Sequence, residues 1–316
     1  MGRRGRARAA ARPIHGWLVI DKPSGITSAA VVARVRKALN AAKAGHGGTL
    51  DPLTTGVLPV VLGEASKTVA YAMNGEKIYR FTVRWGEARA TDDAEGEVTN
   101  TSAVRPTKQE IEAVLGEFVG EISQVPPAYS AIKVKGRRAY ELARADRHFV
   151  LAPRRVTVHR FVLLGVPDSD HAEFEVSCGK GVYVRGLARD LAARLGTVGH
   201  VAAMRRTRAG PFTEDMAISL DNLDTLGHSG LLSEHLLPVE VGLDGLPALA
   251  LTELQAESLR KGRPVQVLRT GKSGACRRIS GRISEGTVVC AMTGGKLVAL
   301  ARVEHGGIRP VRVLNL

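Results

Sequence analysis

Charge is distributed very unevenly along this chain, and no other feature constrains its organisation as strongly. Residues 209–259 contain no Lys or Arg but nine Asp or Glu, whereas residues 260–316 contain twelve basic residues and two acidic ones. Residues 1–208 carry 33 basic residues against 20 acidic ones. A polyanion is attracted to basic surfaces and repelled by acidic ones. The sequence therefore predicts a large and a small basic domain, joined by an acidic connector that does not face a polyanion.

We place the domain boundaries where this charge changes. We expect a disordered basic arm at residues 1–14, a main domain at 15–210, an acidic connector at 211–245 that packs on the main domain, and a small domain at 246–316. A chain of 316 residues exceeds what one hydrophobic core usually serves, which supports two domains. The arm carries five Arg and no acid within its first twelve residues. It lacks the apolar centre of a secretory signal, and we interpret it as an arm rather than a targeting peptide.

Overall composition narrows the class of partner. The formal net charge of +14 indicates a polyanion, with nucleic acid as the first candidate. The hydrophobic fraction of 44% is typical of a globular chain. No segment approaches the roughly 18 consecutive apolar residues that a membrane-spanning helix needs. The three cysteines are too few and too scattered for a disulfide framework. We therefore expect a cytoplasmic protein with no membrane association.

Periodicity predicts helices and strands that do not alternate regularly. Helical spacing of apolar residues predicts a helix from Thr27 or Ser28 to near Asn40, one that follows the capping box of Thr107 and Glu110, and one that Gly196 ends. Alternation predicts strands at 78–85 and 171–178, and a β-hairpin at 288–303. This pattern favours an α+β main domain over a doubly wound parallel sheet, and a mostly β tail.

Residues 45–59 form the densest local signal. Glycines, two prolines, His46 and Asp51 fall within fifteen residues, as is typical of a functional loop held on a rigid scaffold. Considered alone, Asp51 is equally well a turn or helix-capping carboxylate ahead of Pro52, and His46 a hydrogen-bonding loop residue. No glycine-rich phosphate-binding pattern is present, so we expect no nucleotide cofactor.

The same segment resembles the TruB family of tRNA pseudouridine synthases, whose motif reads Gly-His-x-Gly-x-Leu-Asp-Pro-x-x-x-Gly-x-Leu. Further blocks that resemble the family occur in the same order, at Trp17–Ser28, Tyr79–Phe81, Pro126–Lys133 and Gly179–Arg185. The resemblance covers roughly residues 15–215, and the tail is similar to the family's small RNA-binding domain of PUA type. It implies a pseudouridine synthase fold, with a mixed, largely antiparallel sheet and flanking helices, plus a mostly β, PUA-like C-terminal domain.

The family isomerises uridine 55 in the T-loop of tRNA to pseudouridine. The reaction breaks a C–N glycosidic bond and forms a C–C bond to the same base, so we expect no metal and no cofactor. By resemblance, Asp51 is the essential carboxylate. Attack at the ribose C1′, addition at uracil C6 and abstraction of a ribose proton are all compatible with the sequence. Arg185 is carried over as the partner that keeps Asp51 ionised, although an arginine at a helix start also fits a phosphate contact.

A uridine inside a folded loop becomes accessible only when it is turned out of its stack. By resemblance, Tyr79 stacks on the flipped base and serves as the proton acceptor at C5, while Tyr183 lines the same pocket. Considered alone, Tyr79 is a core residue on an apolar strand face. His46 resembles the residue that fills the vacated stack. Met204 matches a position near the base that is usually a larger aliphatic residue.

Charged residues outside this pocket form a second group of predictions. Lys67 matches another basic position of the family and is treated as a substrate contact, with a solvated lysine as the alternative. Asp93 matches an acidic position, but we expect it at a solvated hairpin tip and assign it no catalytic role. Three basic runs are predicted to bind backbone phosphates of the tRNA elbow: Lys133, Lys135, Arg137 and Arg138; Arg154 and Arg155; and Arg205, Arg206 and Arg208.

These observations together predict a monomeric, cytoplasmic tRNA pseudouridine(55) synthase that binds the T-arm and elbow of tRNA. The alternative is a non-enzymatic RNA-binding or tRNA-folding factor that uses the same surfaces. The combination of Asp51, Tyr79, Tyr183 and Arg185 argues against pure binding, because phosphate contacts alone require neither the carboxylate nor its partner.

Overall fold

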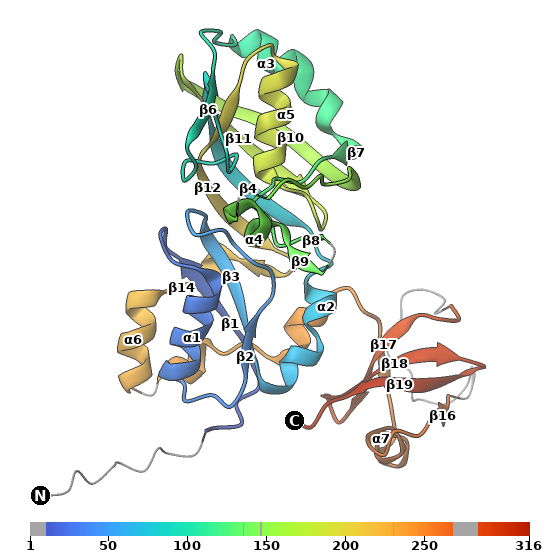
Figure 1. Cartoon of the computed structure of the whole chain (residues 1–316). Coiled ribbons are helices and arrows are strands. Elements are labelled where there is room, and N and C mark those ends of the chain that lie inside the picture. Colours follow the sequence, from blue (N-terminus) through green and yellow to red (C-terminus); the bar gives the residue numbers. More distant parts are fainter. Residues whose placement is uncertain (1–10, 135, 146, 230, 268–283) are drawn as a thin grey trace, which may run out of the picture.

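A ten-stranded mixed sheet forms the centre of the computed structural model, which describes residues 11–134, 136–145, 147–229, 231–267 and 284–316 (Figure 1). Its main path runs in the order β14 (Ile218–Ser219), β1 (Gly16–Lys22), β3 (Thr55–Leu62), β12 (Gly199–Ala209), β4 (Lys77–Trp85), β11 (His171–Cys178), β10 (Arg154–Asp168) and β7 (Gly120–Gln124). The short strands β2 (Ala44–His46) and β13 (Phe212–Thr213) pair with β3 and β12. Only the β1–β14 and β3–β12 pairs are parallel, which confirms the predicted α+β class with a largely antiparallel sheet.

The parallel contact between β3 and β12 divides this sheet into two halves. It consists of two residue pairs, Arg205 with Thr55 and Arg206 with Gly56. Figure 1 shows α3 (Lys108–Val114) and α5 (Val184–Arg194) on the half that contains β4, and α1 (Ser28–Ala38) and α6 (Leu220–Ser229) beside the half that contains β1. The loop between β2 and β3 consequently lies against β12 of the other half.

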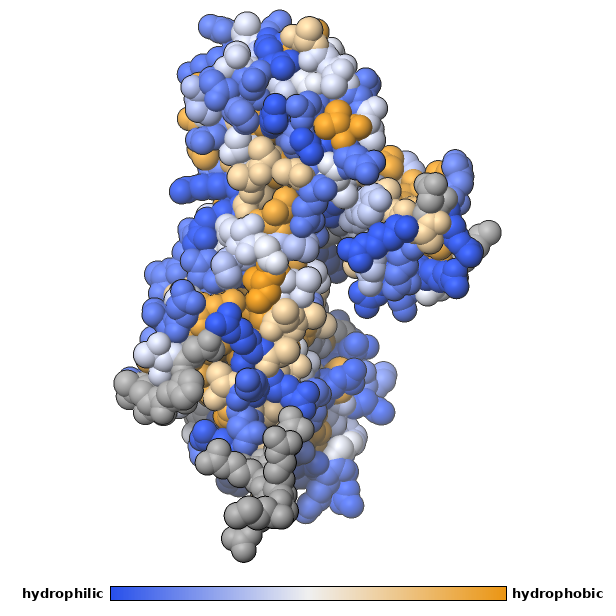
Figure 2. All heavy atoms as spheres, turned by 60° about the vertical axis from the view of Figure 1, so that its left-hand side comes forward, coloured by the Kyte–Doolittle hydropathy of each residue, from blue (hydrophilic) through white to orange (hydrophobic). Residues whose placement is uncertain are grey.

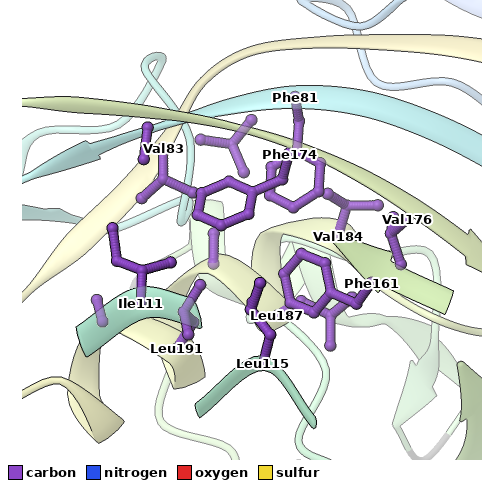
Figure 3. Packing of buried hydrophobic residues seen from close by; sticks show 14 of the residues in the cluster. Phe81, Val83, Ile111, Leu115, Phe161, Phe174, Val176, Val184, Leu187 and Leu191 are labelled. Carbon is purple, nitrogen blue, oxygen red and sulfur yellow. The ribbon is translucent and has the colours of Figure 1, made fainter. Parts of the chain in front are cut away.

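The half that contains β4 buries its apolar strand face against two helices. Figure 3 shows Phe81, Phe161 and Phe174 packed toward Leu187 and Leu191 of α5. Alternation along β4 and β11 directs these rings to one face, because successive side chains of a strand point to opposite sides. Full burial of each leucine contributes about 2 kcal/mol to folding. This packing fixes α5, and with it Arg185, against the sheet.

The predicted helices and strands are confirmed at the positions that patterning indicated. Thr27 caps α1, and Asn40 takes a left-handed conformation after its end, at φ 48°. Thr107 and Glu110 form the capping box of α3. Gly196 follows α5 at φ 71°, where a side chain would be strained. The predicted hairpin corresponds to β17 (Val288–Thr293) and β18 (Lys296–Glu304).

A second sheet forms the C-terminal part of the chain, with the order β15 (Ala248–Ala250), β17, β18, β19 (Gly307–Val313) and β16 (Val265–Gln266), and α7 (Glu253–Arg260) packs against it. This sheet confirms the expected mostly β tail. It contacts the main sheet through an apolar cluster in which Leu300 and Leu314 share a core with Trp17. The residues that join the two sheets, including η5 (Val239–Leu243), also pack in that cluster.

Some sequence predictions fall outside the described residues. These are residues 1–10 of the arm, Lys135, and the basic residues between 268 and 283 together with Cys276. Arg12, within the predicted arm, is hydrogen-bonded: its backbone N–H donates to the Asn40 carbonyl. Within the described ranges, no helix is both long and apolar enough to cross a membrane.

Candidate active site

Asp51 lies in the loop between β2 and β3, and buried polar groups hold this loop from below. The Lys22 ammonium, at the end of β1, is fully buried and donates to the carbonyls of Pro23, Ile26 and Pro52. Ser28 exchanges two hydrogen bonds with the backbone of Leu50. Burial lowers the pKa of Lys22 to about 8, and the Asp51 carboxylate opposes that change. The carbonyls on either side of Asp51 are therefore fixed by residues of the first sequence block, which we had not assigned to the site.

Two glycines allow this loop to approach β12. A side chain at Gly56, which has φ 95°, would meet the Arg206 carbonyl at 2.2 Å. Gly48, with φ 116°, lies against the Arg206 guanidinium, which donates to the carbonyls of Gly48 and Val57. Arg206 is only 2% exposed. The prediction that Arg206 binds phosphate is therefore wrong: the guanidinium is buried and ties the Asp51 loop to β12.

Arg185 lies at the start of α5 and pairs directly with Asp51. Its Nε is 3.0 Å from Asp51 Oδ2. Its Nη1 donates to the Thr91 carbonyl at 2.6 Å, and its Nη2 donates to the Tyr129 carbonyl at 2.9 Å. The Arg185 side chain is 5% exposed, which excludes the alternative of a phosphate contact, whereas that of Asp51 is 38% exposed and reachable by a substrate.

Asp93 is a second carboxylate of this site, and our expectation of a solvated hairpin tip is wrong. Its side chain is 7% exposed, and its Oδ2 is 3.5 Å from Arg185 Nη1. The Thr91 hydroxyl and the Glu95 backbone N–H donate to its Oδ1. Sequence position alone did not reveal this burial, because the run at 92–97 reads as solvated. The match to an acidic family position was the available signal.

Electrostatics at Asp51 reflect both neighbours. Partial burial removes solvent from the Asp51 carboxyl and raises its pKa above the ordinary value. Arg185 opposes this rise, and the Asp93 carboxylate adds to it. The Lys22 ammonium also opposes the rise, so the ionisation of Asp51 depends on Arg185, Asp93 and Lys22.

The phenols of Tyr79 and Tyr183 lie near enough to Asp51 to interact with its charge. Tyr79 lies on β4 and packs against the apolar clusters of both halves of the sheet. Burial raises the pKa of Tyr79 and that of Tyr183, and the Asp51 charge adds to both increases. Tyr183 is the residue that precedes α5, two positions before Arg185. Both phenols are therefore neutral hydrogen-bonding groups near neutral pH.

His46 and Met204 lie around the same junction. His46 ends β2, and burial together with the Arg206 charge lowers the pKa of its ring. Its Nδ1 is buried and has no hydrogen-bond partner among the residues that the structure describes. Met204 pairs with Phe81 across β12 and β4 and packs at the edge of the Phe81 core.

A surface hollow lies at the junction of β3 and β12. Leu53, Thr55 and Met204 contribute to the lining of a hollow of about 440 Å³, together with Arg80 and Arg205. Figure 2 shows apolar side chains interrupting a mostly hydrophilic surface near the middle of the molecule. Arg205 donates to Asp21 and to Glu214, so its charge is compensated and its predicted phosphate role is not supported.

Lys67 lies elsewhere. Its ammonium is 2.6 Å from Glu64 Oε2 and donates to the Val313 carbonyl at the end of β19. It is therefore in contact with the C-terminal sheet, and none of its described hydrogen bonds or ion pairs involves Asp51, Tyr79 or Tyr183. Among the described residues, no group of three His, Cys, Asp or Glu side chains is arranged to hold a metal ion.

Other described residues of the predicted basic runs are exposed. Arg137 and Arg138 lie on β9 (Arg137–Arg138), which pairs with β8 (Lys133–Val134), and the basic residues of this hairpin that the structure describes, Lys133, Arg137 and Arg138, are exposed. The Arg155 side chain is 83% exposed and pairs with Glu121. These side chains are accessible from solvent, and their contacts to RNA phosphates stay a prediction.

Comparisons with known proteins agree with this geometry. Residues 36–184 match the N-terminal domain of TruB family pseudouridylate synthase, and residues 185–244 match the C-terminal domain of tRNA pseudouridylate synthase B. The chain is 54% identical to tRNA pseudouridine synthase B of Rhodospirillum rubrum over 100% of both chains, and 52% identical to that of a Caulobacter species over 96% of this chain and 97% of the relative.

Solved structures show the same fold. A chain from a structure of an H/ACA RNP bound to a substrate RNA containing 2'-deoxyuridine superimposes with a TM-score of 0.72 at 25% identity, over 96% of this chain and 86% of that chain. An archaeal Nop10–Cbf5 complex gives a TM-score of 0.71 at 26% identity, over 95% and 86%. Fold and site together define a pseudouridine synthase. The chain belongs to the TruB family of these enzymes.

Proposed function

We propose that this enzyme isomerises uridine 55 in the T-loop of tRNA to pseudouridine, with Asp51 as the essential carboxylate. The observation that carries the proposal is the contact of Asp51 with Arg185 at 3.0 Å, in a position that leaves the carboxylate 38% exposed. A carboxylate that only stabilised the fold would not need a buried cationic partner on one side and an opening on the other. The identity to enzymes named tRNA pseudouridine synthase B supports the choice of tRNA as substrate.

The reaction requires the target base to leave its stack before the carboxylate can reach it. In the proposal, Tyr79 stacks on the flipped base, and Tyr183 and Met204 line its pocket. His46 fills the vacated stack. The Lys67 ammonium faces the C-terminal sheet. Its proposed contact with the substrate therefore rests on the resemblance alone.

The chemistry balances without an added reactant. The bond between C1′ and N1 breaks, and the detached uracil turns so that a bond forms between C1′ and C5. The proton on C5 leaves to the Tyr79 hydroxyl as its acceptor, and the neutral phenol gives up its own proton in the same step. One proton is thereby returned to N1, so the reaction loses and gains one proton in total. Asp51 participates either as nucleophile at C1′ or C6 or as the base that removes a ribose proton. Arg185 holds Asp51 ionised in each route, because a cation at 3.0 Å favours the charged form.

Binding of the T-arm and elbow would rest on the exposed basic residues of the β8–β9 hairpin and of β10. We propose that the chain acts as a monomer in the cytoplasm, with residues 15–210 as the catalytic domain, 211–245 as the connector and 246–316 as a PUA-like RNA-binding domain. The second sheet supports the last assignment.

Release of tritium from [5-³H]uridine in a tRNA transcript tests this function, because C5 loses its hydrogen in the reaction. The transcript should release one tritium per molecule, and a transcript that carries cytidine at position 55 should release none. If the protein binds both transcripts equally and releases no tritium, the RNA-binding or tRNA-folding alternative replaces the enzyme.

A further inference from the structure

Gln124, the last residue of β7, makes an unusual pair of hydrogen bonds. Its Nε2 donates to the Tyr183 carbonyl at 3.0 Å, and its Oε1 accepts from the Tyr183 backbone N–H at 2.9 Å. Gln124 is only 2% exposed. Its side-chain amide therefore takes the place of a neighbouring peptide group and satisfies both backbone groups of one residue.

Those two backbone groups belong to the residue at which α5 begins. Tyr183 is the N-cap of α5 and makes no side-chain capping bond of its own. Arg185, the partner of Asp51, follows two residues later. The Gln124 amide consequently fixes the point from which both the Tyr183 ring and the Arg185 guanidinium project.

Gly186 provides an independent sign of the same contact. A Cβ built at Gly186 would lie 3.0 Å from Nε2 of Gln124 and 3.2 Å from its Cδ. Gly186 is inside α5 and takes an ordinary helical conformation, so space and not backbone freedom requires glycine there. Glycine costs up to about 1 kcal/mol in a helix relative to alanine. The helix thus carries an unfavourable residue at the point where the amide needs room.

The residues that follow Gln124 continue this attachment. The Val125 carbonyl accepts from Arg189 at 2.7 Å, and the Tyr129 carbonyl accepts from Arg185 at 2.9 Å. The segment from Gln124 to Tyr129 is thereby fastened to α5 at three points. It leads directly into the exposed basic hairpin of β8 and β9.

We propose that Gln124 is a positioning residue for the isomerisation: it acts through the Tyr183 backbone to hold the Tyr183 ring and Arg185 in register with Asp51. The proposal rests on the proposed function and adds a residue to its machinery. It requires an amide at this position, because the amide places a donor and an acceptor side by side at the end of one side chain, in the spacing of a peptide group.

Replacement of Gln124 by methionine tests the proposal, since methionine has a similar length but neither hydrogen-bonding group. In single-turnover tritium release, the rate constant of Gln124→Met should fall roughly ten- to a hundredfold, as expected when a reacting group is displaced by about 1 Å. The Kd for the transcript should change less than about twofold, because phosphate contacts supply most of the affinity. Gln109→Met, at an exposed amide on α3, is the matched control and should behave as wild type.

Gly186→Ala provides a second route to the same defect and serves if the first variant does not fold. It should reduce the rate constant, and its effect combined with Gln124→Met should be smaller than the product of the two, because both displace one amide. Gly116→Ala, where an added Cβ meets nothing within 4 Å, is its control.

A wild-type rate constant in Gln124→Met, or effects of the two variants that multiply fully, would overturn the positioning role. A loss that appears only in Kd would also overturn it. Absence of tritium release from the wild-type protein would instead contradict the proposed function, so the two failures are distinct.

Discussion

Arg185 serves two carboxylates at once, and this sharing is the central electrostatic feature at the scale of single residues. Asp51 and Asp93 approach it at 3.0 and 3.5 Å. The pKa of Asp51 is raised because packing around it removes solvent, and Asp93 adds to that rise. An ionised Asp51 is required by every route considered, so activity should fall as the pH drops through this raised pKa.

Asp93→Asn should lower the pKa of Asp51, because it removes a like charge and leaves Arg185 to Asp51 alone. The acid limb of the pH profile of kcat/KM should therefore move to lower pH. The pH dependence of tritium release measures this limb. Asp215→Asn, at an exposed aspartate of η3 (Glu214–Met216), is the control and should leave it in place. A limb that stays fixed or moves to higher pH in Asp93→Asn would contradict the shared arrangement.

Arg206 is the residue for which charge and position lead to opposite expectations. Because its guanidinium is buried and donates to the carbonyls of Val57 and Gly48, Arg206→Met should lower the free energy of unfolding by about 3 kcal/mol, since it leaves these acceptors without their charged donor. Arg155→Met, at an exposed salt bridge, should lower it by less than about 1 kcal/mol. Urea unfolding of both variants measures the difference. Equal values for the two would show that burial of Arg206 has been misjudged.

The residues of the site divide by what a sequence can reveal. Asp51 and Arg185 were found because local motifs mark them, and the structure places them in contact. Asp93 and Arg206 were misplaced because a charged residue in a polar run reads as solvated, and burial depends on strands distant in sequence. Lys22 was quoted within a motif but was not recognised as the support of the Asp51 loop.

At the scale of elements, α5 organises the site with arginines one helical turn apart. Arg185 reaches Asp51, and Arg189 reaches Asp92 Oδ2 at 2.8 Å. Asp92 has φ 59°, so the Arg189 contact holds a bend that turns the next residue, Asp93, inward. The helix itself was predictable from its leucine spacing and from Gly196.

A double-mutant cycle tests this attachment. Arg189→Met and Asp92→Asn should show a coupling of about 1 kcal/mol in unfolding free energy, since the two groups are in contact and largely shielded. The exposed pair Arg194 and Glu117, on the other end of α5, should couple by less than about 0.5 kcal/mol. A coupling energy that is as small for Arg189 and Asp92 as for Arg194 and Glu117 would contradict a role of Arg189 in holding the bend at Asp92.

The pairing of elements was less predictable than the elements themselves. Alternation and caps located β4, β11, α1 and α3, because these signals lie within a few residues. The β3–β12 contact joins Thr55 to Arg205, and no local pattern encodes a pairing over that separation. The site forms at the contact between β3 and β12. Its residues could therefore be identified from local motifs, but their distances from one another could not be predicted from the sequence.

At the scale of the whole molecule, the basic residues fall into an exposed group and a group that is buried or paired. Basic residues are exposed on the β8–β9 hairpin, whereas Arg206 is buried and the half-exposed Arg205 is paired with Asp21 and Glu214. The acidic stretch that was expected to avoid a polyanion contributes β14 and η5 to packing on the main sheet. Net charge predicted the class of partner correctly but did not distinguish buried from exposed arginines.

Salt dependence of RNA binding tests the basic hairpin. Arg137→Met should weaken transcript binding and reduce the slope of log K against log salt by about 1, because one phosphate contact is lost. Arg194→Met, whose charge is paired with Glu117, should leave the slope unchanged. An unchanged slope in Arg137→Met would exclude this hairpin from the phosphate-binding surface.

The most direct test of the whole account is tritium release from [5-³H]uridine in a tRNA transcript by wild type and by Asp51→Asn. The account predicts stoichiometric release by the wild type and a rate reduced by more than about 10³-fold in Asp51→Asn, with transcript Kd within about twofold, since asparagine keeps the shape but not the reactive charge. Release by Asp51→Asn at the wild-type rate would contradict the assignment of Asp51 as the essential carboxylate.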